Sequence, residues 1–123
     1  MARILVIDDE DAIRGVLKRI LSMAGHEVVE AEDGDVGTRL FEASDFDLVI
    51  TDLIMPEKEG IETILDLREG HPDVRILVVS GGHSLDKTGS LEDAEALGAD
   101  ASLAKPFSVE ELLGAVDALL AKD

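Results

Sequence analysis

Polar side chains with chemical potential follow several apolar runs of this 123-residue chain. Asp8 and Asp9 come directly after the first run, Asp52 ends another, and Ser80 and Lys105 follow later ones. Three carboxylates that meet in one crevice repel one another, and a divalent cation relieves that repulsion. Ligation by carboxylates without His or Cys favours a hard ion, and a half-open site with few protein ligands suits Mg²⁺ better than Ca²⁺.

A Mg²⁺ ion with a lysine opposite it would make a binding place for a phosphoryl group. Asp52 could then act as a nucleophile and form an acyl phosphate. The metal and Lys105 would neutralise the charge on the transferring oxygens. The chemistry that these residue types favour is therefore phosphoryl transfer to an aspartate.

Each of these residues also has a purely structural interpretation. Asp8 or Asp9 could cap the following helix, and Asp52 could stabilise a loop turn. Ser80 could belong to a tight turn with the two glycines after it, and Lys105 could be an ordinary surface lysine. The structural interpretation requires all of these separate explanations to coincide at one edge of one sheet. We therefore favour the functional interpretation.

The segments before these positions predict the strands that must hold them. Continuous apolar runs are typical of strands buried on both faces. The predicted strands are residues 3–7, 27–30, 48–50, 75–79 and 101–104. Apolar residues at helical spacing predict helices over residues 13–21, 35–43, 61–70, 91–97 and 109–120. The alternation predicts an α/β fold, a doubly wound five-stranded parallel sheet whose strands all end at one edge.

Composition limits the classes of function. The formal net charge of −17 makes direct nucleic-acid binding improbable, because such a surface repels phosphate backbones. The chain has no cysteine, no apolar run of membrane-spanning length and no signal-peptide pattern, so we expect a cytoplasmic protein without membrane insertion. The length predicts one domain over residues 1–123, with no effector domain in this chain.

Several segments together resemble the receiver domain of two-component response regulators, the CheY-like superfamily. These segments, which match in order and spacing, are residues 4–10, 47–56, 76–81, 98–100 and 103–107. The resemblance implies a flavodoxin-like sheet with the strand order 2-1-3-4-5. It also implies a signalling protein that catalyses only its own phosphorylation and dephosphorylation.

In the resemblance, Asp52 matches the phosphoacceptor, which takes a phosphoryl group from a sensor histidine kinase or a histidine phosphotransfer protein. Lys105 matches the lysine that contacts the phosphoryl group, and the bond between Lys105 and Pro106 is usually cis in this family. Ser80 matches the switch hydroxyl that moves toward the phosphoryl oxygens. A downstream protein target would receive the signal.

The resemblance also implies a set of Mg²⁺ ligands. Asp9 and Asp52 match the direct side-chain ligands, and the backbone carbonyl of Ile54 matches the third. Asp8 would act mainly through a metal-bound water. One position departs from the family, because Ser102 stands where a switching Tyr or Phe is usual.

Two alternatives remain at this point. A docking module that is not phosphorylated is mildly favoured by Ser102, whereas the intact acidic residues, Ser80 and Lys105 disfavour it. A Mg²⁺-dependent phosphohydrolase with Asp52 as nucleophile is disfavoured, because such enzymes usually carry an acid/base aspartate where this chain has Ile54.

Overall fold

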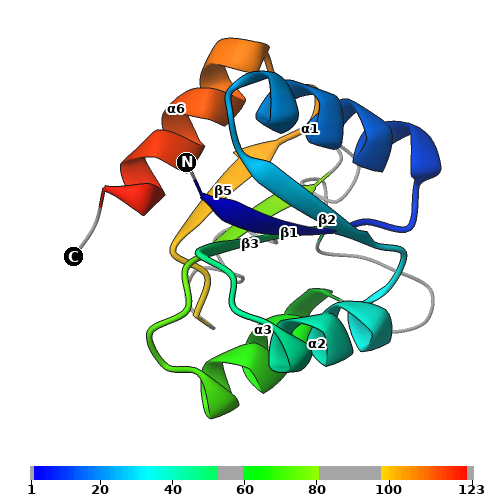
Figure 1. Cartoon of the computed structure of the whole chain (residues 1–123), viewed down its shortest axis with the longest axis vertical. Coiled ribbons are helices and arrows are strands. Elements are labelled where there is room, and N and C mark those ends of the chain that lie inside the picture. Colours follow the sequence, from blue (N-terminus) through cyan, green and yellow to red (C-terminus); the bar gives the residue numbers. More distant parts are fainter. Residues whose placement is uncertain (1, 53–59, 81–97, 122–123) are drawn as a thin grey trace.

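The computed structural model describes residues 2–52, 60–80 and 98–121 (Figure 1). Its strands are β1 (Arg3–Ile7), β2 (Glu27–Ala31), β3 (Leu48–Asp52), β4 (Ile76–Ser80) and β5 (Ala101–Ala104). The helices over these residues are α1 (Asp11–Met23), α2 (Gly34–Ala43), α3 (Gly60–Gly70) and α6 (Val109–Leu120). The five predicted strands and four of the predicted helices are confirmed, whereas the helix predicted over 91–97 lies outside the described residues.

The five strands form one parallel sheet in the order β2-β1-β3-β4-β5, as the resemblance predicted. Ile7 at the end of β1 pairs with Thr51 in β3, and Asp52 pairs with Val79 in β4. The carboxyl ends of these three strands are therefore nearly level. The residues that follow them meet at one edge, where open α/β sheets usually bind ligands.

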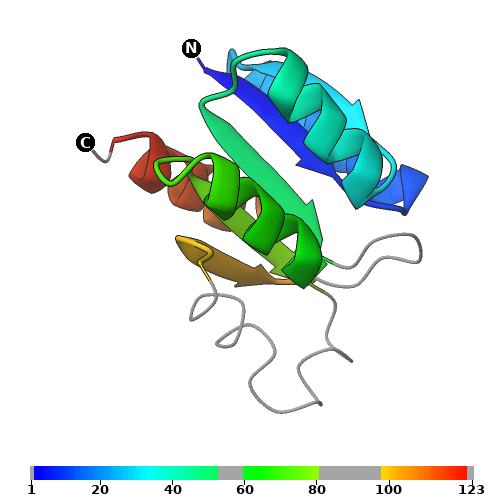
Figure 2. The same cartoon turned by 90° about the horizontal axis from the view of Figure 1, so that it is seen from below.

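Apolar cores lie on both faces of the sheet. Helices α1 and α6 cover one face, and α2 and α3 cover the other (Figure 1, Figure 2). Side chains alternate between the faces along each strand, so Leu5 and Ile7 belong to the α2–α3 core while Ile4 and Val6 belong to the α1–α6 core. This burial on both sides explains why the strands are continuous apolar runs.

The last helix begins with the capping box that its sequence predicts. The Glu111 amide donates to Ser108 Oγ at 3.0 Å, and the Ser108 amide donates to Glu111 Oε1 at 2.8 Å. These two bonds satisfy amide groups that the first turn of a helix leaves unpaired. They define the start of α6, whose N-cap Ser108 lies three residues after Lys105.

Helix α2 approaches β1 closely at Gly37. A Cβ atom at this position would lie 2.4 Å from Ile7 Cδ1 and 2.7 Å from Ile7 Cγ1. Ile7 is fully buried and directly precedes Asp8. The missing side chain of Gly37 therefore lets α2 pack against the strand that carries the first acidic residues.

We predict opposite effects for one substitution in two helices. Gly37→Ala should lower the free energy of unfolding by about 1–3 kcal/mol, because the new methyl group overpacks the core around Ile7. Gly15→Ala on the exposed side of α1 should raise it by about 0.5–1 kcal/mol, since nothing lies within 4 Å and alanine favours the helix. Urea unfolding measures both, and equal stabilisation would contradict the close approach.

Candidate functional site

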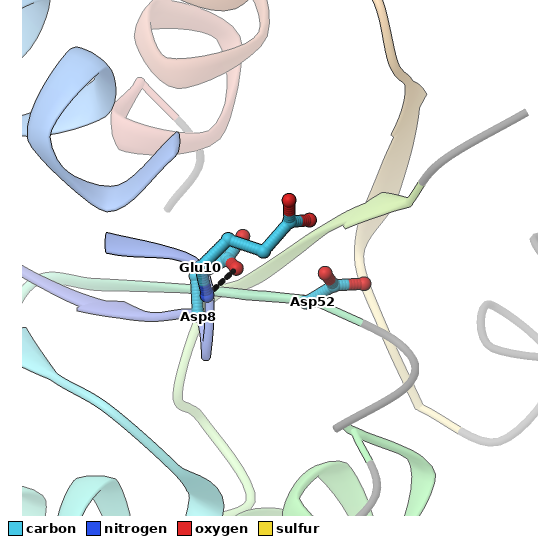
Figure 3. Close-up of side chains that lie close together, drawn as sticks. All are labelled: Asp8, Glu10 and Asp52. Atoms are coloured by element: carbon cyan, nitrogen blue, oxygen red, sulfur yellow. Dashed lines mark hydrogen bonds between the residues drawn. The ribbon is translucent and has the colours of Figure 1, made fainter. Parts of the chain in front are cut away.

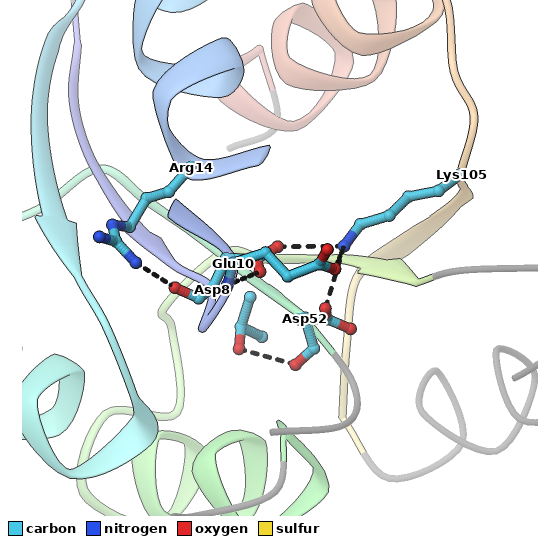
Figure 4. Close-up of polar contacts among 6 residues, drawn as sticks. Asp8, Glu10, Arg14, Asp52 and Lys105 are labelled. Atoms are coloured by element: carbon cyan, nitrogen blue, oxygen red, sulfur yellow. Dashed lines mark hydrogen bonds and ion pairs between the residues drawn. The ribbon is translucent and has the colours of Figure 1, made fainter. Parts of the chain in front are cut away.

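Asp52 is the last residue of β3 and is only 6% exposed. Its Oδ2 atom accepts a hydrogen bond from Lys105 Nζ at 3.0 Å (Figure 4). The buried hydroxyl of Thr51 donates to the Asp52 carbonyl oxygen at 2.9 Å. The carboxylate predicted to be the nucleophile therefore lies at the carboxyl edge of the sheet, directly against the predicted lysine.

Asp8 follows β1 and is fully buried. Its amide donates to the Ala31 carbonyl at 3.1 Å, which continues the pairing of β1 with β2. Its Oδ1 accepts from the Glu10 amide at 2.9 Å, and its Oδ2 accepts from Lys105 Nζ at 3.1 Å. Both carboxylate oxygens of Asp8 are thus hydrogen-bonded, as buried polar atoms require.

Glu10 completes a group of three carboxylates that sequence reasoning did not assemble. Oxygen atoms of Asp8, Glu10 and Asp52 lie within 4.8 Å of one another (Figure 3). The bond from the Glu10 amide to Asp8 Oδ1 closes a local turn, which accounts for side chains two residues apart lying together. The signal was present in the run Asp8-Asp9-Glu10, but residue types alone do not indicate where each side chain points.

The structure does not bring Asp9 into this group. Its side chain is exposed, between two neighbours that join the cluster. The role of Asp9 as a direct metal ligand stays a prediction. Ile54, whose carbonyl was the other predicted ligand, lies outside the described residues.

Lys105 comes from the loop between β5 and α6 and joins the three carboxylates. Its ammonium group lies 3.0 Å from Asp52, 3.1 Å from Asp8 and 3.9 Å from Glu10. The side chain is only 12% exposed. The Lys105–Pro106 bond is cis, as predicted from the resemblance.

The two positions that the resemblance predicts to act in switching lie on neighbouring strands. Ser80 is the last residue of β4 and pairs with Ala104 of β5. Ser102, within β5, pairs with Val78 of β4. Ser102 is half-buried. The residue at this position is not aromatic, which is the departure from the family pattern that the sequence shows.

Burial and charge act in opposite directions on the groups of this pocket. Burial of the Asp8 carboxyl raises its pKa above the ordinary value, and the charge of Asp52 adds to this, although the Glu10 amide and Lys105 partly offset both. Burial alone would lower the pKa of Lys105, but the hydrogen bond and charge of Asp52, together with Asp8, outweigh this and raise it. The lysine is therefore protonated near neutral pH.

This set of donors fits a hard divalent cation. Three carboxylates face one ammonium group, so the pocket keeps an excess of negative charge when Asp8 is ionised. All of the side-chain donors are oxygen atoms, which Mg²⁺ prefers. The residues that could hold the ion are Asp8, Glu10 and Asp52, together with Asp9 and Ile54 as the resemblance implies.

Comparison with known families matches residues 4–117 to the response regulator receiver domain. The chain belongs to this family. Receiver domains are signalling modules of two-component systems that interact with histidine kinases and bind Mg²⁺ in an acidic pocket. The described pocket stands where that acidic pocket is expected.

Individual relatives agree with the family. The transcriptional regulatory protein CpxR of Escherichia coli (strain K12) is 38% identical over 120 residues, which make up 98% of this chain and 50% of CpxR. The response regulator MprA of Mycolicibacterium vanbaalenii is 41% identical over 118 residues, which make up 96% of this chain and 50% of MprA. A crystal structure of a receiver domain protein from Clostridium thermocellum superposes with a TM-score of 0.88 at 31% identity, covering 98% of this chain and 94% of the other.

These matches correct one expectation. The receiver chain spans about half the length of the curated relatives it matches, and CpxR is named a transcriptional regulatory protein. This conflicts with the expectation of no direct nucleic-acid binding. That expectation came from the net charge of these 123 residues, and it does not extend to relatives that are twice as long.

The helices give one further result about membranes. Within the part of the chain that the structure describes, none of them is both long and apolar enough to cross a bilayer.

We predict a pH-dependent effect of Asp8→Asn on the metal-free receiver. The raised pKa means that the folded protein binds the Asp8 proton more tightly than the unfolded chain does. The wild-type protein therefore loses stability as the pH rises from about 4, the pKa of Asp8 in the unfolded chain, through its higher pKa in the folded protein. Because asparagine carries no charge, the stability of the variant relative to wild type should increase with pH over this window.

Urea unfolding in the presence of a chelator at several pH values between 4 and 8 measures this difference. The asparagine side chain can still accept from the Glu10 amide, so the local turn is retained. A difference that shrank as the pH rose would contradict the raised pKa.

Proposed function

We propose that this receiver accepts a phosphoryl group on Asp52 from a phosphohistidine of a partner protein. The observation that carries the proposal is the carboxylate of Asp52 at 3.0 Å from Lys105 Nζ, beside Asp8 and Glu10. A nucleophile, a cation and a carboxylate pocket for a metal ion are the components that phosphoryl transfer needs. The partner is a sensor histidine kinase or a histidine phosphotransfer protein in the cytoplasm.

The transfer is an in-line displacement at phosphorus. An oxygen atom of the Asp52 carboxylate attacks the phosphorus atom, so that an O–P bond forms while the P–N bond to the donor histidine breaks. The electron pair of the P–N bond stays on the leaving imidazole. Lys105 donates hydrogen bonds to the transferring oxygens once it turns from the carboxylate to the phosphoryl group. Mg²⁺, when bound, neutralises charge on those oxygens.

The metal site in this proposal combines carboxylates that lie together in the structure with ligands that the resemblance implies. Asp9, Asp52 and the carbonyl of Ile54 would hold the ion directly, as the resemblance implies, and Asp8 would act through a metal-bound water. The cluster also contains Glu10, whose carboxylate would add negative charge beside the ion. Together these groups would hold the ion between the acidic loop after β1 and the end of β3.

We further propose that phosphorylation changes the conformation of the chain through Ser80 and that a downstream protein target reads the change. Residues 1–123 act as a single receiver domain. Ser102 replaces the aromatic residue that usually moves with the switch hydroxyl. This replacement is the observation that favours the second candidate, a docking module that does not depend on phosphorylation.

We predict that Asp52 is the only acceptor of phosphate from a small donor. Incubation of the wild-type protein with Mg²⁺ and acetyl phosphate should give a single phosphoryl adduct in an intact-mass spectrum. Asp52→Asn should give none, because an amide is a poor nucleophile for this displacement. Asp45→Asn, at an exposed aspartate outside the pocket, is the matched control and should react like wild type.

Other outcomes distinguish the alternatives. An adduct on Asp52→Asn would place the acceptor elsewhere. If the wild-type protein formed no adduct and bound no Mg²⁺, the docking module would be favoured. Continuous release of phosphate from a simple phosphate ester, such as para-nitrophenyl phosphate, would favour the phosphohydrolase.

A further inference from the structure

We propose that Arg14 is a positioning residue of the acidic pocket, which holds the loop Asp8-Asp9-Glu10 in the geometry that binds Mg²⁺. The inference rests on the proposed function, because it concerns the same pocket. Arg14 is the fourth residue of α1 and touches none of the three clustered carboxylates in any described contact. Its action is therefore on the backbone that carries them.

The side chain of Arg14 binds one backbone oxygen and two carboxylates outside the pocket. Its Nη1 donates to the Asp8 carbonyl oxygen at 2.6 Å (Figure 4). Its Nε donates to Glu30 Oε1 on β2 at 3.3 Å, and its Nη2 pairs with Asp11. Only 14% of the side chain is exposed. Its planar guanidinium therefore contacts three partners in a largely buried position.

Arg14 donates hydrogen bonds to the first and the last residue of the acidic loop. Its own backbone amide donates to the Glu10 carbonyl at 2.9 Å, while its guanidinium binds the Asp8 carbonyl. The Asp8 amide is already paired with Ala31 on β2. The amide and the carbonyl of Asp8 are thus both hydrogen-bonded, which fixes the backbone from which its carboxylate projects toward Lys105.

The charge of Arg14 is compensated where it stands. The carboxylates of Asp11 and Glu30 pair with the guanidinium, and Glu30 also pairs with Lys18 at 3.4 Å. Arg14 therefore contributes orientation to the pocket more than positive potential. Lys18 shares Glu30 with it but makes no described contact with the acidic loop, and this makes it a matched control.

Loss of a partner that orients metal ligands usually weakens metal binding by 10–100-fold. We expect Arg14→Met to weaken the binding of Mg²⁺ alone by about 10-fold, the lower end of that range, because several bonds still hold the loop. Arg14→Lys should recover only part of the affinity, since an ammonium group lacks the planar fork that binds three partners at once. Lys18→Met should leave the affinity unchanged.

The experiment is a calorimetric Mg²⁺ titration of the wild-type protein and the three variants, each first shown to be folded by urea unfolding. Amide spectra supply a second measurement. The Glu10 amide, which donates to Asp8 Oδ1, should shift in Arg14→Met and not in Lys18→Met. A role confined to stability would lower the urea midpoint of Arg14→Met but leave the Mg²⁺ affinity of the folded protein and the Glu10 amide unchanged.

The outcomes separate this inference from the proposed function. Wild-type affinity in Arg14→Met, or full recovery in Arg14→Lys, would overturn the positioning role while leaving phosphoryl transfer intact. If Arg14→Met does not fold, Arg14→Lys decides by the same criterion. A wild-type protein that bound no Mg²⁺ would overturn the proposed function, and the inference with it.

Discussion

The site depends on the ammonium group of Lys105. It lies 3.0 Å from Asp52 and 3.1 Å from Asp8, two buried carboxylates that would otherwise face each other, and 3.9 Å from the exposed carboxylate of Glu10. Repulsion between like charges is strong where water is excluded, so one central cation greatly reduces the cost of gathering them. Because Lys105 follows β5, the same ion pairs also connect the last strand of the chain to the ends of the first and third.

That cation can reach its partners only because the sheet is parallel and in register. Ile7 pairs with Thr51, so the residues after β1 and at the end of β3 emerge side by side. The apolar cores on both faces exclude water up to the edge, which leaves Asp8 fully buried with a raised pKa. A buried carboxylate of this kind costs stability in the metal-free state. The same property gives a divalent cation a large gain when it binds.

The family assignment gives the class of signalling to which the chain belongs. The departure from the family pattern at Ser102 is a feature of this chain. Receiver domains interact with histidine kinases, and the curated relatives are about twice as long as the chain. Ser102 stands where the resemblance leads one to expect an aromatic residue. Arg14 connects the acidic loop to α1 and, through Glu30, to β2.

Much of this architecture followed from the sequence alone, because strands buried on both faces and amphipathic helices have different apolar periods. The five strands, the sheet order implied by the resemblance, and the meeting of Asp8, Asp52 and Lys105 were predicted from the sequence, although β2, β3 and β4 end one or two residues later than predicted. Only the tertiary structure decided that Glu10 joins the carboxylates and that Arg14 binds the Asp8 carbonyl. The physical reason is that spacing identifies which strand end a residue occupies. The direction of a side chain in a turn depends on hydrogen bonds to partners far away in the sequence.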